Sequence, residues 1–220
     1  MSRRQGKKAE ETRRNILSAA EELFMSRGYD AVTMREIAKK AGCSHTAIYI
    51  YFREKEVLLL ELSLPLLKAL KKQLDDIMDQ EGHPHEILTT LCLALIRFGL
   101  TFRNTYPFLF TVKSSPVEAT QPLLEINQIR LEIFAKFKLA IQHSLPFVEK
   151  DEQLLTNVHI LFYTLHGIIV THSFPGESPQ ERIDQLTPVF REACEVLISG
   201  FRSRYQAESF ISTWTGMTEL

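Results

Sequence analysis

Cysteine is scarce in this sequence of 220 residues, and its spacing argues against a metal site. The three cysteines, Cys43, Cys92 and Cys194, form no CxxC pair and no even-numbered framework. Zinc ribbons and disulfide scaffolds require such patterns, so both classes are disfavoured and a reducing compartment fits best. The pair His83 and His85 lacks a third convergent ligand, so we expect no metal and no cofactor.

Long apolar segments are also missing. No apolar run approaches the ~20 residues that a membrane-spanning helix needs. The first eight residues are basic, and a charged stretch beginning at Ala9 follows them instead of an apolar segment. That order does not match a secretory signal. We therefore expect no membrane partner and a cytoplasmic protein.

An excess of charge of one sign is lacking as well, because the formal net charge is −1. The distribution is uneven, however. Residues 1–60 hold 12 Lys and Arg against 8 Asp and Glu, whereas residues 61–220 hold 14 against 19. A basic front end on an acidic remainder indicates a nucleic-acid-binding head.

Strand-like alternation of apolar and polar residues is absent, and glycine and proline number only nine each. The apolar residues recur instead with the helical period, which predicts an all-α fold of about nine helices. We expect these helices at about residues 9–27, 33–41, 45–52, 57–78, 84–102, 106–112, 123–143, 151–171 and 179–201.

Two short helices separated by a glycine-containing turn are the most informative feature. Thr33 and Glu36 form a capping box at the start of the first helix, and Ser44 is a candidate N-cap for the second. The turn at Ala41–Cys43 gives the spacing of a helix-turn-helix. A plain packing corner has the same spacing, so spacing alone leaves DNA binding and protein interaction both open.

The motifs around this turn resemble the N-terminal domain of TetR-family transcriptional regulators. The match covers about residues 10–62 in unbroken register and rests on Thr12-Arg-Arg-Asn-Ile-Leu-Ser-Ala-Ala-Glu-Glu-Leu-Phe24, Arg27-Gly-Tyr29, Thr33-Met-Arg-Glu-Ile-Ala38, Ala41-Gly42, Ala47-Ile-Tyr-Ile-Tyr-Phe52 and Lys55-Glu-Val-Leu-Leu59. The resemblance implies a DNA-binding head at residues 9–62, with the helix-turn-helix at about 33–52. It further implies a helical ligand-binding and dimerisation domain at 63–203, followed by a tail at 204–220.

The resemblance also implies roles for individual side chains. The expected DNA-binding residues are Thr33, Arg35, Ser44, His45, Thr46, Ala47, Tyr49, Tyr51 and Lys55. His45 and Thr46 match positions that enter the major groove, although the family more often has lysine and glycine there. Threonine and alanine methyl groups suit a thymine methyl. Tyr49 and Lys55 match phosphate contacts, and Tyr51 has a mixed role between phosphate neighbour and core.

A basic N-terminal segment precedes the matched region. Two interpretations remain open for it: a solvated tail, or an arm that follows the phosphates or enters the minor groove. Its charged members are Arg3, Arg4, Lys7, Lys8, Arg13 and Arg14.

The last two helices carry apolar residues over more than one face, which predicts burial on two sides and hence a homodimer. The predicted interface residues are Leu161, Ile168, Ile169, Val189, Phe190, Val196 and Leu197. A monomer core is the alternative explanation. A two-fold dimer would read a palindromic operator in double-stranded DNA.

Nine of the 14 phenylalanines fall between Phe98 and Phe174, which raises the hypothesis of an apolar effector pocket. Plain core packing is the alternative for each of these residues. The candidate lining is Phe98, Phe102, Tyr106, Phe110, Phe134, Phe137, Phe162, Tyr163 and His166. No catalytic constellation is present, which disfavours an enzyme. The expectation is therefore a bacterial, ligand-responsive repressor that an apolar small molecule releases from DNA.

Overall fold

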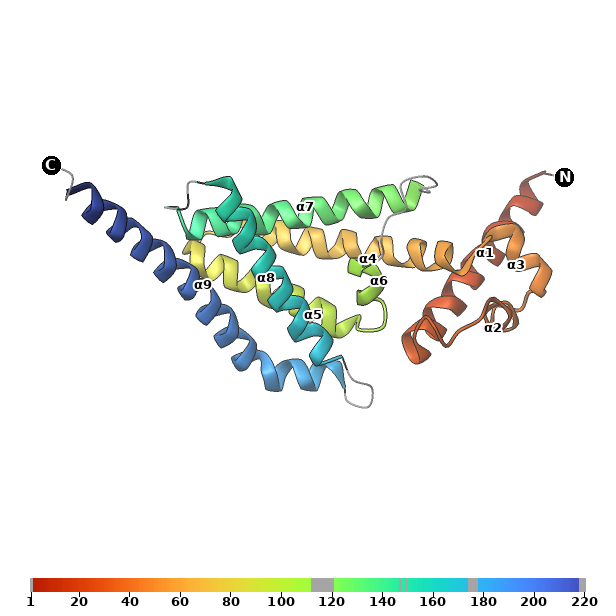
Figure 1. Cartoon of the computed structure of the whole chain (residues 1–220). Coiled ribbons are helices and arrows are strands. Elements are labelled where there is room, and N and C mark those ends of the chain that lie inside the picture. The colour runs from red at the N-terminus through yellow and green to blue at the C-terminus, as the bar shows by residue number, and fades with distance from the viewer. Residues whose placement is uncertain (1, 112–120, 147, 149, 174–177, 218–220) are drawn as a thin grey trace. The chain divides into compact units, whose positions relative to one another are not determined.

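A computed structural model describes residues 2–111, 121–146, 148, 150–173 and 178–217. Within them the chain is all-α, as predicted, and no strand occurs. The elements are α1 (Ser2–Arg27), α2 (Met34–Lys40), α3 (His45–Tyr51), α4 (Lys55–Met78), α5 (Pro84–Thr101), α6 (Tyr106–Thr111), α7 (Gln121–Ser144), α8 (Asp151–Thr171) and α9 (Pro179–Met217). Figure 1 shows their order along the chain.

The chain forms two compact units, and their boundary differs from the expected one near residue 62. The first unit comprises Met1–Ala69 and Phe102–Arg130, and the second comprises Leu70–Thr101 and Leu131–Leu220. α4 contributes its first part to the first unit and its last part to the second. Contiguous sequence motifs do not reveal this partition, because α6 and the start of α7 fold with the N-terminal helices.

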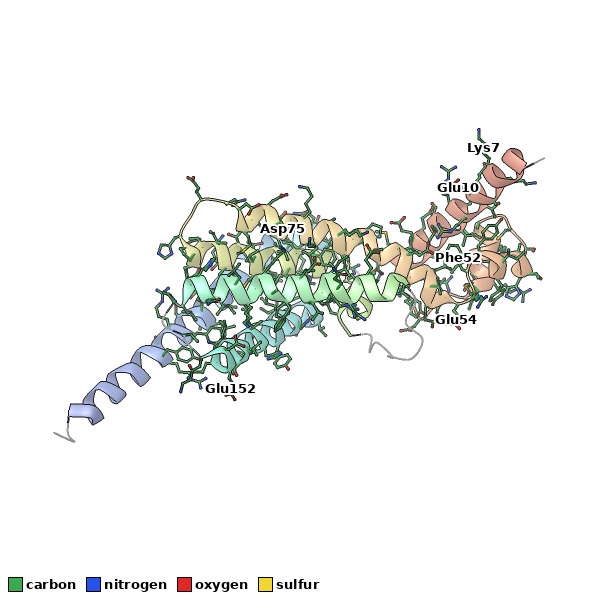
Figure 2. The ribbon with its side chains drawn as sticks, turned by 90° about the horizontal axis from the view of Figure 1, so that it is seen from above. Lys7, Glu10, Phe52, Glu54, Asp75 and Glu152 are labelled. Atoms are coloured by element: carbon green, nitrogen blue, oxygen red, sulfur yellow. The ribbon has the colours of Figure 1, made fainter. Side chains whose placement is uncertain are left out.

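The N-terminal head within the first unit, formed by α1 to α3 and the start of α4, has its own hydrophobic core. The apolar stripe of α1 supplies Ile16 and Phe24, which pack with Ile37 of α2 and Ile48 of α3. All four are at most 3% exposed. Phe52 closes this core and lies among the helices in Figure 2. The apolar residues that recur with the helical period in these segments thus pack together into one buried cluster.

The second unit is built around α5, which packs against α9 and α8. Eleven residues of α5 are buried, so this helix has almost no polar face. At Gly99 the backbone of α5 lies close to α8, because a Cβ added there would lie 2.7 Å from two side-chain carbons of Ile169. The glycine therefore permits a helix contact that any larger side chain would obstruct.

α8 is, by length and composition alone, apolar enough to cross a membrane, contrary to the sequence-based expectation. Seven of its residues are buried in the second unit, including Leu161, Leu165 and Ile169. The core helix of a globular unit passes the same test. Its remaining exposed apolar residues are considered below.

α9 is longer than predicted and continues to Met217 instead of ending near Phe201. The predicted tail at 204–220 is therefore helical over its described residues. Tyr205 is buried, and its hydroxyl donates to Asn157 Oδ1 of α8 at 3.2 Å. This anchor lies beyond the last apolar residue that the sequence pattern identified, and no glycine or proline follows it before Gly216.

Candidate nucleic-acid interface

The start of α2 is fixed by a capping box, as predicted. Thr33 Oγ1 accepts from the Glu36 amide at 3.3 Å, and Glu36 Oε2 accepts from the Thr33 amide at 2.9 Å. The same carboxylate accepts from Arg27 Nη1 at 2.8 Å, and Arg27 also donates to the carbonyl of Ala31. The Arg27 side chain therefore links the end of α1 to the start of α2. Arg27 and Glu36, two residues of the resemblance, thus have structural roles.

Hydrogen bonds from Arg27 and Thr33 lower the pKa of Glu36 from 4.5 to about 2. Because the folded value is depressed, the stabilisation is fully present above pH 4.5 and is lost as the pH falls toward 2. We expect Glu36→Gln to lower the thermal midpoint of the head at pH 6. The gap to wild type should narrow as the pH is lowered from 4.5 to 3.

Thermal unfolding followed by circular dichroism across this pH range measures that gap. Glu10→Gln, at an exposed position of α1, is the matched control and should leave the midpoint unchanged. If the thermal midpoint of Glu36→Gln stays the same number of degrees below that of wild type at every pH, the ionised Glu36 carboxylate is not the source of the stabilisation.

The turn into α3 is fixed by backbone geometry and a second cap. Gly42 has φ +71°, in the left-handed region that favours glycine. Ser44 is extended and its Oγ accepts from the Ala47 amide at 3.0 Å. Both features agree with the predicted helix-turn-helix, and they set the direction in which α3 leaves the turn.

α3 buries one side and exposes the other. Ile48 is fully buried, whereas Ala47 and Tyr51 are partly buried against the head. The exposed side carries His45, Thr46 and Tyr49. The rings of His45 and Tyr49 meet edge to face at 5.3 Å between centroids. Thr33, Arg35 and Ser44 are also exposed, so the predicted DNA-binding residues are accessible apart from the partly buried Ala47, Tyr51 and Lys55.

Lys55 has internal partners that sequence reasoning missed. Its Nζ donates to the carbonyls of Tyr29 and Val32, both at 2.9 Å, and lies 4.0 Å from the centre of the Tyr29 ring. Tyr29 in turn donates from its hydroxyl to Glu56 Oε1 at 2.7 Å. Burial and this carboxylate raise the pKa of Tyr29. The Lys55 side chain therefore ties the start of α4 to the turn after α1, and these two carbonyls use two of its three N–H groups.

We expect Lys55→Met to destabilise the head by about 2–3 kcal/mol, because two part-buried carbonyls lose a charged donor. Denaturant unfolding measures this loss. Lys39→Met, at an exposed site of α2, is the control and should lie within about 0.5 kcal/mol of wild type. If the free energy of unfolding of Lys55→Met equals that of wild type, the bonds from Lys55 to the two carbonyls do not stabilise the head.

The N-terminal basic segment is partly engaged within the protein. Arg13 pairs with Glu61 and lies 5.2 Å from the ring centre of Phe52, so it belongs to the head. Lys7 and Lys8 are exposed, and Lys7 lies at the outer end of α1 in Figure 2. The side chains of Arg3 and Arg4 lie outside the described residues.

The predicted effector-pocket residues are divided between the two units. In the second unit Phe162 stacks on Phe134 at 5.5 Å and meets Phe137 at 5.0 Å. Phe98 is buried in the same unit, and His166 is half-buried, which lowers its pKa. Tyr163 is 71% exposed, so its assignment to a pocket does not hold.

The other three predicted pocket residues belong to the first unit. Tyr106 is buried, and its ring lies 4.8 Å from that of Phe110. Phe102 lines a cavity of about 30 Å³ together with residues of α1 and α4. A cavity of that size holds about one water molecule and no effector. These residues serve the core of the first unit in this conformation.

The predicted dimer residues separate into two groups. Leu161, Ile169 and Phe190 are at most 3% exposed and belong to the core of the second unit. Their prediction as interface residues is therefore wrong, because they pack within the chain. Val189 and Val196 are 61% and 63% exposed, and Ile168 and Leu197 are intermediate. Tyr163 and Val170 of α8 are apolar and exposed as well, at 71% and 62%. The apolar residues of α8 and α9 cover a wide part of each helix, and only the packed structure shows which of them face outward.

Comparison with known proteins identifies the head. Residues 16–62 match the N-terminal domain of the bacterial regulatory proteins of the tetR family. This region spans the end of α1, both helix-turn-helix helices and the start of α4. Residues 16–62 therefore form a TetR-type N-terminal domain. The curated proteins that the chain matches are HTH-type transcriptional regulators.

Two curated TetR-like relatives illustrate the match. The HTH-type transcriptional regulator YhgD of Bacillus subtilis is 36% identical over 90 residues, which cover 41% of this chain and 47% of that protein. The HTH-type transcriptional repressor BepR of Brucella suis is 29% identical over 143 residues, covering 61% and 66%. The chain thus aligns with about half to two thirds of the length of these relatives.

The fold of most of the chain is also found among solved structures of transcriptional regulators, some of them described as TetR/AcrR-family proteins. FadR from Bacillus subtilis, solved in complex with stearoyl-CoA, has a TM-score of 0.60 at 19% identity and covers 84% of this chain and 97% of its own. At this identity the comparison shows the fold alone.

Proposed function

We propose that this TetR-family regulator is a homodimeric, cytoplasmic repressor that binds a palindromic operator and is released by a largely apolar small molecule. The exposed side of α3 carries the proposal, because two caps and the buried Ile48 fix its orientation. His45, Thr46 and Tyr49 are presented together on that side. A short helix of this kind fits the major groove.

The residues of the head take distinct roles in the proposed complex. His45, Thr46 and Ala47 face base edges, while Tyr49, Tyr51, Arg35, Thr33 and Ser44 contact phosphates. Lys55 adds one N–H to the backbone contacts while its other two hold the turn after α1. The phosphate contacts position the protein on the duplex, and the contacts to base edges select the sequence.

Exposed apolar residues on α8 and α9 support the dimer. Tyr163 and Val170 are seven residues apart on α8, and Val189 and Val196 are seven apart on α9. Gly167 lies between the first pair, and a Cβ added there meets no atom within 4 Å. Glycine inside a helix is unfavourable unless another backbone must approach. A second copy packed on this face gives a two-fold bundle of four helices.

The effector is proposed to enter the second unit near the aromatic cluster of Phe134, Phe137 and Phe162. This cluster has no charged member, which suits an apolar ligand. FadR of similar fold was solved with stearoyl-CoA, which is consistent with such a ligand class. His166 contacts Phe162 at 6.0 Å between ring centres and supplies a neutral polar group beside the cluster.

Repression and release follow from linkage. An effector that binds best to a conformation with the two α3 helices wrongly spaced must weaken operator binding by its differential affinity. The operator weakens effector binding by the same factor. Within the first unit, Asn104 donates to the Met25 carbonyl at the end of α1, at 2.8 Å. This bond connects the segment before α6 to the head and is a route for the coupling.

Selection of bound duplexes from a random library, followed by fluorescence anisotropy, tests the proposal. We expect an enriched inverted repeat whose half-sites lie about one helical turn apart. Arg35→Ala should weaken binding to all duplexes and reduce the salt slope by about 1. Arg97→Ala, at an exposed site of α5, is the control. Absence of any enriched sequence at low salt would refute the proposal.

A further inference from the structure

The exposed side of α3 has two chemically different edges. His45 and Tyr49 are four residues apart and form the aromatic edge, with their rings in contact. Thr46 and Ile50 are also four residues apart, so they share the other edge. Ile50 carries no hydrogen-bonding group, and threonine presents a methyl as well as a hydroxyl. The second edge is therefore largely apolar.

Ile50 is the most exposed large hydrophobic residue described in the chain, at 80%. Its exposure has no explanation in the packing of the head, because the buried side of α3 is filled by Ile48. A single exposed isoleucine elsewhere would need none. Here it lies on the face that the proposed function presents to DNA, where its partner must be apolar.

The major groove offers one apolar group, the C5 methyl of thymine. We infer that Ile50, together with the methyl of Thr46, is a specificity-determining residue that selects thymine in each half-site. The two residues lie about 6 Å apart along the helix, which places their targets within about two base pairs. This inference rests on the proposed function, since it requires α3 to lie in the groove.

Deoxyuridine tests the contact, because it differs from thymidine only in that methyl. The full-length protein is titrated against the selected operator and against duplexes in which single thymines are replaced by deoxyuridine. For wild type, one replacement in a single half-site should weaken binding about fourfold. For Ile50→Ala the same replacement should change the affinity by less than twofold. The exposed position predicts unaltered folding, which circular dichroism verifies.

Leu131→Ala is the matched control, since Leu131 of α7 is 70% exposed and belongs to the second unit, whereas α3 belongs to the first. It should keep the wild-type ratio between the two duplexes. The inference is overturned if Ile50→Ala retains that ratio at every position. It is also overturned if Ile50→Ala weakens scrambled and selected duplexes equally, which would indicate a sugar or backbone contact. Failure to select any operator would instead refute the proposed function, and with it this reading of α3.

Discussion

A variant that carries Val189→Asp and Val196→Asp is expected to be monomeric and to bind its operator at least about 100-fold more weakly than wild type. Both side chains are more than 60% exposed on one face of α9, so the charges leave the subunit core intact. In a dimer they would be buried opposite their own copies without a partner. Loss of the second half-site removes the gain from bivalent binding, which is typically 10²-fold or more.

Light scattering after size-exclusion chromatography reports the mass, and anisotropy reports the affinity. The matched control is Leu131→Asp with Leu139→Asp, which charges a second exposed apolar pair on α7. This control should remain dimeric and retain operator affinity. A Val189→Asp and Val196→Asp variant that remains dimeric would contradict the placement of the interface. A monomer that binds the full palindrome as tightly as wild type would contradict the need for a dimer.

Gly99→Val is expected to destabilise the second unit by about 2–3 kcal/mol. The added Cβ alone would lie 2.7 Å from Ile169 Cδ1 and Cγ2, closer than side chains tolerate. Overpacking of a filled core has a cost of this size. Denaturant unfolding measures it, and the expected order of stability places wild type above the variant.

A double variant separates this clash from general intolerance of valine in α5. Ile169→Ala alone leaves a cavity and should be destabilised, but adding Gly99→Val should cost little more or restore part of the loss. Gly6→Val is the control, because an added Cβ there meets no atom within 4 Å. Strictly additive losses in the double variant would show that the contact between α5 and α8 does not limit the packing.

The local parts of the structure followed from the sequence. Capping boxes, glycine turns and apolar stripes act over four to eight residues, so they located the helices and the two caps at Thr33 and Ser44. The exposed readers His45, Thr46 and Tyr49 followed from the same periodicity, because a short helix with one buried residue has an unambiguous outer side.

The long-range contacts between helices could not be predicted from the sequence. In α8 and α9 the apolar stripe is wider than one contact surface, so pattern alone assigned Leu161, Ile169 and Phe190 to the dimer when they pack within the subunit. Lys55 was assigned to DNA from the family resemblance, and nothing near it along the chain predicts its bonds to carbonyls 23 and 26 residues away. The length of α9 depended on Tyr205 meeting Asn157, which is also a long-range contact.

The single fully buried residue of α3 has a consequence for how such a regulator changes over time. Because Ile48 is the only residue of α3 that is fully buried, the exposed His45, Thr46, Tyr49 and Ile50 contribute little to folding. Under the proposed function, substitutions at these four positions alter which operator is bound without threatening the stability of the head. Two duplicated copies of such a regulator gene would then acquire different target sites through a few mutations on this face, while the proposed effector response and dimer are retained. The recognition helix is, in this sense, the most evolvable part of the molecule.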